Sequence, residues 1–264
     1  SRRFGLGWES PYTVRYASNL DDGPDHGMPL GGFGAGCLGR SPSGAFNLWN
    51  LDGGEHWFGS IPDCQFVLWE QQGEDVRAHA LATAPDRDDT DPSGGTPLSA
   101  WQWYPASTQG RSTGTYAARY PLSWAHHEDV YRAAVLCEAF SPILPGDYQR
   151  TSYPVAVFRW QFSNPTDQPL ELSLMLCWRN TVGWFTNTDA AAEVHFRDDG
   201  SPEHNYAPAI GRGEGQRNRQ VDQPGLSGVL LEGQSSTPLA EGEGQWCLAL
   251  PDDLDGVHVL RGSR

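Results

Sequence analysis

Apolar and polar residues alternate with a period of two along several short segments of the chain, which is the spacing of a β-strand. The clearest of these segments are 64–70, 76–81, 131–140, 155–163 and 170–176, and shorter ones follow at 229–231, 246–250 and 257–260. Polar and glycine-containing breaks separate them, and no helix longer than about three turns is indicated. The pattern predicts an all-β chain.

Two pairs of neighbouring strands are expected to form hairpins. The polar break at 71–75 joins the strand at 64–70 to the strand at 76–81. The turn sequence Asn164-Pro165-Thr166-Asp167 joins the strand at 155–163 to a strand at 170–176 whose leucines share one face. Hairpins without interleaved helices favour an antiparallel β-sandwich over a parallel α/β sheet.

The composition supports a globular domain and excludes several kinds of partner. Hydrophobic residues make up 38% of the 264 residues and include 11 tryptophans, which supply enough apolar area for a packed core. The 33 acidic residues outnumber the 18 basic ones, all of which are arginine, and the net charge is −15. The absence of lysine excludes a Schiff-base lysine from this chain, and the acidic balance argues against nucleic acid or an anionic membrane as a partner.

The five cysteines are widely spaced and lack the close pairs that metal sites and disulfide frameworks use. We expect free thiols, most of them buried, with no bound metal and no cofactor. The sequence has no N-x-Ser/Thr sequon, no run of 18 apolar residues and no signal peptide at its start. These features predict a cytoplasmic protein.

The run from Gly34 to Gly39 matches the dinucleotide-binding pattern G-x-G-x-x-G. That chemistry requires a helix to begin at the last glycine, so that its N-terminus faces a pyrophosphate. Here a turn at 40–44 follows, and then a strand at 45–49. A glycine-rich hairpin packed close to another backbone is therefore the preferred interpretation.

Candidate carboxylates for glycoside hydrolysis do not form an obvious pair. Such hydrolysis needs two carboxyl groups, about 5–5.5 Å apart for retention of configuration and about 6.5–9.5 Å apart for inversion. Glu55 and Asp147 lie in loops near aromatic residues, and either could serve a site. The commoner role of such loop acids is to accept backbone N–H bonds.

Two polar or aromatic clusters also have a structural and a functional interpretation. The run 126–129, which reads His-His-Glu-Asp, is expected to be a solvated turn because adjacent side chains on a strand cannot easily bind one metal ion. Trp101 and Trp103 share one face, as in a sugar-stacking platform, although packing in a core or interface is the preferred interpretation.

Three sequence blocks, taken together, resemble the amino-terminal half of glycoside hydrolase family 116. The resemblance runs from about residue 27 to residue 180 and weakens after residue 188. Its blocks are Gly27-Met-Pro-Leu-Gly-Gly-Phe-Gly-Ala-Gly36 with the following 44–51, then Tyr120-Pro-Leu-Ser-Trp124, and then the run 140–158 that contains Ser141-Pro-Ile-Leu-Pro-Gly-Asp147-Tyr148.

The resemblance implies a two-part enzyme in which an amino-terminal β-sandwich packs on a carboxy-terminal (α/α)₆ barrel. In that family the barrel carries the nucleophile and the acid/base, and it hydrolyses β-glucosides, including glucosylceramide, with retention. Residues 1–264 would be the sandwich, which need not be complete at Arg264, and no catalytic residue can be assigned to this chain. Candidates for the cleft rim or the domain interface are Asp147, Tyr148, Trp178, Arg179, Asn180 and Glu55.

Two other functions stay open at this point. The chain could be a free-standing carbohydrate-binding sandwich that uses exposed tryptophans and needs no barrel. It could also be a small self-sufficient glycosidase that uses Glu55 or Asp147, in which case this chain alone would turn over substrate.

Overall fold

The computed structural model describes residues 26–51, 56–85, 95–105, 114–186, 195–196, 202–203, 208–235 and 244–252. In these residues all strand pairs within the sheets are antiparallel, and the fold is the expected all-β sandwich. Helical structure in this part of the chain consists of one 3-10 turn, η3, and one α-helical turn, α2 (Leu98–Ala100 and Tyr148–Thr151). None of the described helices is long and apolar enough to cross a membrane.

The first two sheets have four strands each. One has the order β1-β2-β3-β4, with strands at Met28–Leu30, Cys37–Arg40, Phe46–Asn50 and Trp57–Phe58. The other has the order β10-β9-β8-β7, with strands at Val157–Ser163, Ala134–Phe140, Leu122–His127 and Gly114–Arg119. The predicted glycine-rich hairpin is confirmed, because β2 pairs with β3 and no helix follows Gly39.

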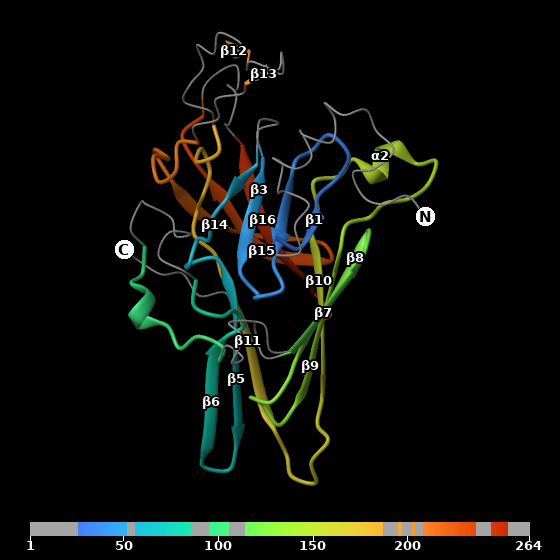
Figure 1. The fold of residues 1–264 in the computed structure, drawn as a ribbon, viewed down its shortest axis with the longest axis vertical. Helices are drawn as coiled ribbons and strands as arrows, with labels where there is room; N and C mark the ends of the chain where they lie inside the picture. The colour runs from blue at the N-terminus through green and yellow to red at the C-terminus, as the bar shows by residue number, and fades with distance from the viewer. Residues whose placement is uncertain are drawn as a thin grey trace.

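The remaining sheets are smaller. One has the order β11-β5-β6, with strands at Glu171–Cys177, Gln65–Gln72 and Asp75–Ala80. Another has the order β14-β15-β16, with strands at Arg217–Gln223, Leu226–Glu232 and Gln245–Pro251. A short pair is formed by β12 and β13, at His195–Phe196 and Pro202–Glu203. In Figure 1 the long strands β5, β6, β9 and β11 reach toward the bottom, while β1, β3 and β14–β16 occupy the upper half.

The predicted β5–β6 hairpin is confirmed, with Val67 opposite Ala80 and Gln72 opposite Asp75. The predicted hairpin between the strands at 155–163 and 170–176 is wrong, because β10 pairs with β9 whereas β11 pairs with β5. The turn at 164–168 instead carries the chain from one sheet to the other. Both strands direct their apolar side chains into the shared core. Two strands show this same alternation whether they pair in one sheet or lie in facing sheets, so the pattern does not identify the partner.

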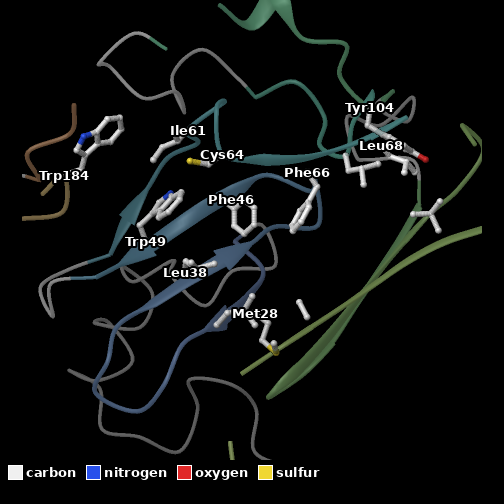
Figure 2. Packing of buried hydrophobic residues seen from close by; sticks show 14 of the residues in the cluster. Met28, Leu38, Phe46, Trp49, Ile61, Cys64, Phe66, Leu68, Tyr104 and Trp184 are labelled. Atoms are coloured by element: carbon white, nitrogen blue, oxygen red, sulfur yellow. The ribbon is translucent and has the colours of Figure 1, made fainter. Parts of the chain in front are cut away.

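The core is a cluster of aromatic and aliphatic side chains between the sheets. Figure 2 shows Trp49, Phe46 and Phe66 lying in a row within it. The rings of Phe46 and Phe66 are 6.1 Å apart, and the Trp49 ring is stacked on Phe185 at 5.2 Å. The indole N–H of Trp49 donates to the carbonyl of Gly59 at 3.0 Å, so this buried polar group is satisfied.

Glu70 joins β5 to the chain entering β9. Its side chain is fully buried and accepts the backbone N–H of Arg132 at 3.0 Å and that of Ala133 at 2.8 Å. The Arg132 guanidinium lies 3.6 Å from the same carboxylate. This buried carboxylate therefore links the sheet that contains β5 to the sheet that contains β9, and its loss would leave buried N–H donors unsatisfied.

The expectation of a solvated turn at 126–129 is wrong for His127. This residue ends β8 on the inner face, where its ring lies 6.0 Å from that of Trp160 and 5.2 Å from that of Tyr104. Burial lowers the pKa of His127 to about 3, and the nearby Arg40 guanidinium adds to the effect. His126 points outward, with its Nδ1 2.9 Å from a carboxylate oxygen of Glu128. The strand continues further than predicted, and its alternation separates the two histidines.

Candidate functional site

The loop between β1 and β2, residues 31–36, is here called the glycine loop. It contacts a segment more than 100 residues away in the sequence. The Gly31 N–H donates to Ser141 Oγ at 2.7 Å, and the Phe33 N–H donates to the Thr151 carbonyl at 3.0 Å. A Cβ at Gly32 would lie 2.5 Å from the backbone of Ser152, so the close approach requires glycine at that position. The phenyl ring of Phe33 is left outside, 56% exposed.

The segment 141–155, which the glycine loop contacts, is held together by hydrogen bonds among its own polar groups. Thr151 is buried, and its hydroxyl bonds to both the N–H and the carbonyl of Leu144, at 2.9 and 3.1 Å. Ser141 donates its hydroxyl to the Val155 carbonyl at 2.8 Å. This frame holds the single helical turn α2 outward, and Tyr148 on it is 79% exposed.

Asp147 caps α2. Its Oδ1 accepts the backbone N–H of Arg150 at 3.0 Å, and its Oδ2 accepts the Nε–H of the same residue at 2.5 Å. The backbone bond, followed by the side-chain bond, lowers the pKa of Asp147. A general acid in glycoside hydrolysis needs a raised pKa instead. Asp147 therefore has the contacts of a structural loop acid.

The turn between β7 and β8 lies beside this segment. Leu122 of β8 is opposite Phe140 of β9, which in turn is opposite Val157 of β10. The turn residue Tyr120 is thus next to the two ends of the segment 141–155, and it is 53% exposed. Figure 1 shows the labels of β1, β8 and α2 on the same side of the molecule.

These three segments gather exposed apolar side chains at one end of the sandwich. Six of the twelve large hydrophobic residues that are exposed among the described residues belong to them. We call this group the motif end: Phe33, Tyr120, Leu144, Tyr148, Tyr153 and Val155. All three sequence blocks that carry the family resemblance contribute to it. Rigid loops with exposed aromatic rings are typical of a contact surface.

Trp178, Arg179 and Asn180 lie where β11 leaves its sheet, and their contacts differ from those of the motif end. The Trp178 ring packs into the core, 5.1 Å from that of Phe46 and 5.7 Å from that of Trp246. The Arg179 guanidinium lies 4.8 Å from the centre of the Trp184 ring.

Asn180 uses its amide within the domain. Its Nδ2 donates to the Glu232 carbonyl at 2.9 Å and to Asn218 Oδ1 at 3.2 Å, and its Oδ1 accepts the Val182 N–H at 3.1 Å. This side chain therefore anchors the end of β11 to the sheet β14-β15-β16. A role for residues 178–180 at a cleft rim stays a prediction, and Glu55 lies outside the described residues.

The motif end also contains three aromatic residues that are not among the candidates from the sequence, namely Phe33, Tyr120 and Tyr153. All three lie in loops rich in glycine or proline, where an aromatic residue has no strand alternation to place it in a core. An aromatic residue in a loop rich in glycine or proline is therefore the feature of the sequence that could have identified them. Trp101 and Trp103, the other aromatic pair considered, lie with their rings 6.0 Å apart and are both partly buried.

Metal binding has no visible basis in the described part of the chain, where no three His, Cys, Asp or Glu side chains gather around a common point. The five cysteines are free, with Cys64 and Cys137 buried and Cys247 exposed. Burial raises the pKa of the Cys137 thiol to about 11, which makes it unreactive at neutral pH.

Comparison with protein-family models gives a match over residues 27–264, to the model described as beta-glucosidase 2, glycosyl-hydrolase family 116 N-term. The match begins at the first block of the motif end and spans all the sheets described above. The chain belongs to glycoside hydrolase family 116, as its amino-terminal domain.

Proposed function

We propose that this chain is the non-catalytic amino-terminal domain of a retaining β-glucosidase that acts on β-glucosides, including glucosylceramide. In this proposal a catalytic (α/α)₆ barrel outside the chain supplies the nucleophile and the acid/base. The motif end lies against that barrel and borders the substrate cleft. The observation that carries the proposal is that the blocks shared with family 116 converge on exposed side chains and not only on the core.

The arrangement of the motif end suits a supporting role. Its loops are tied by the bonds from Gly31 to Ser141 and from Phe33 to Thr151, so they present their rings without a further loss of backbone entropy on contact. Tyrosine and phenylalanine combine a large apolar area with few rotatable bonds, and such residues dominate the binding energy of many interfaces.

The chemistry of the carboxylates supports the same division of roles, with support from this chain and catalysis by the barrel. A retaining mechanism needs an acid whose pKa is raised and a second carboxylate about 5–5.5 Å away. Asp147, the candidate at the motif end, is held ionised by Arg150, with its pKa lowered. It serves the loop that presents Tyr148, and the reacting carboxylates belong to the barrel.

Substitutions in the longer protein that carries this chain test the proposal. Tyr148→Ser and Phe33→Ser remove exposed rings of the motif end, while Met175→Ser and Leu226→Ser remove exposed apolar side chains elsewhere. We expect kcat/KM for an aryl β-glucoside to fall about tenfold in the first pair, as loss of about 1.4 kcal/mol of transition-state stabilisation would give, and to stay unchanged in the second. Equal values in the two pairs would refute the role of the motif end.

A further inference from the structure

The outer face of the sheet β10-β9-β8-β7 carries a row of polar and aromatic side chains that the proposed function does not use. The register places Ala117, Trp124, Glu138 and Arg159 side by side, one from each strand. Their neighbours Cys137 and Trp160 belong to the adjacent row, which faces the core. Because side chains alternate along a strand, the row with Trp124 faces away from the core.

Glu138 organises this row. Its Oε2 accepts the indole N–H of Trp124 at 3.1 Å, and its Oε1 is paired with the Nη2 group of Arg159. The carboxylate is largely covered, whereas the Arg159 side chain is 60% exposed. One buried carboxylate thus holds an indole ring and a guanidinium in place on the two neighbouring strands.

The next row along the same face adds hydrogen-bonding groups. It contains His126 and Gln161, both exposed, with Leu136 between them. Two residues along a strand span about 7 Å, so one sugar residue with its hydroxyl groups can contact both rows. The sheet is continuously paired from β8 to β10, so these side chains stand on a rigid surface.

We propose that Trp124, Glu138 and Arg159, with Gln161, form a saccharide-binding site on this face. The indole would stack on the apolar face of a pyranose, and Arg159 and Gln161 would donate hydrogen bonds to its hydroxyl groups. The inference goes beyond the proposed function, since binding of a saccharide here requires no catalytic domain.

The chemistry of the row favours a neutral, amphipathic ligand over the other classes. Glu138 and Arg159 neutralise each other, and the chain carries a net charge of −15, so a polyanion would be repelled. A single indole bordered by charged and amide groups is too polar for a lipid chain. A sugar ring, which has an apolar face edged by hydroxyls, matches this arrangement.

The test measures binding of cellotetraose to the full chain by isothermal titration calorimetry. Trp124→Ala removes the stacking surface, and Arg159→Gln removes the exposed guanidinium with its fork of donors. Arg217→Gln is a matched control, because Arg217 also pairs an exposed guanidinium with a buried carboxylate, that of Glu232, on another sheet. Thermal melts of each variant check that it folds.

We expect saturable binding by the unsubstituted chain and by Arg217→Gln, no measurable binding by Trp124→Ala, and an affinity about tenfold weaker for Arg159→Gln. If Trp124→Ala fails to fold, the affinity of Arg159→Gln tests the proposal instead, because the exposed Arg159 side chain is not part of the core. Absence of saturable binding by the unsubstituted chain would overturn the proposal. An affinity that is unchanged in Arg159→Gln, or in a folded Trp124→Ala, would also overturn it. These results do not depend on whether the longer protein hydrolyses glucosides.

Discussion

Replacing Gly32 by alanine is expected to separate the glycine loop from the segment 141–155 while leaving the core in place. The new Cβ would lie 2.5 Å from the carbonyl carbon of Ser152 and 2.5 Å from the carbonyl oxygen of Tyr153. Both are backbone atoms that cannot rotate away, so the two segments must move apart by about 1 Å. Overpacking of this kind costs about 1–3 kcal/mol, and loss of the bond from Phe33 to Thr151 adds about 1 kcal/mol.

The free energy of unfolding should therefore fall by about 2–4 kcal/mol, measured from urea transitions followed by tryptophan fluorescence. Gly244→Ala is the control, because a Cβ at that position has no atom within 4 Å. In the longer protein, Gly32→Ala should also lower kcat/KM for an aryl β-glucoside, since it displaces Phe33 and the rest of the motif end. Equal unfolding midpoints for the two variants would refute the reasoning about close approach.

Three further predictions concern buried polar groups. Glu70→Ala should cost about 3–5 kcal/mol in urea unfolding, because it leaves the backbone N–H groups of Arg132 and Ala133 without their buried acceptor and removes the carboxylate beside the Arg132 guanidinium. Asn180→Ala should cost about 2–3 kcal/mol by the same assay, since the Glu232 carbonyl loses a buried donor. For His127, the folded-state pKa of about 3 lies below the unfolded value of about 6.5, so the unfolded state binds the extra proton between these pH values. Stability should fall as the pH drops through that window, and His127→Gln should flatten the decline in unfolding experiments at a series of pH values.

Local alternation predicted strands well and their partners less well. The short polar break at 71–75 correctly predicts the β5–β6 hairpin, because two strands this near in the sequence need only a short turn to pair. The turn at 164–168 has equally good turn residues, with the Asn164 amide bonding to the Gln168 carbonyl at 2.7 Å, yet it joins two sheets. Turn chemistry specifies a reversal of direction, while the choice of partner depends on contacts far away in the sequence.

Strands without alternation were harder still to predict. β14 has the sequence Arg-Asn-Arg-Gln-Val-Asp-Gln, and most of its side chains are exposed. It lies in the polar, glycine-containing break between the strands predicted at 170–176 and 229–231, because a strand with little burial has no hydrophobic period. Its place is set by pairing with β15, where Arg217 lies opposite Glu232.

The residues of the candidate site can likewise be identified from local sequence, but their contacts cannot. The motif block at 140–158 identifies Asp147 and Tyr148 as candidates, but the hydrogen bonds that tie their loop to the glycine loop connect residues more than 100 positions apart. Trp178 and Asn180 were also singled out by sequence, and the structure gives them core and inter-sheet contacts that no local pattern could specify. The exposure of an aromatic residue is a property of the folded surface, so the glycine- and proline-rich loops around Phe33 and Tyr120 indicate only that these rings can be exposed, and the fold shows that they are.

The division of roles between this chain and a catalytic barrel is best tested by hydrolysis of an aryl β-glucoside, measured for this chain alone and for the longer protein that carries it. We expect turnover by the longer protein, with retention of the anomeric configuration, and none by the isolated chain under the same conditions. Turnover by the chain alone would contradict the division of labour, and Glu55 and Asp147 would then become the first carboxylates to replace.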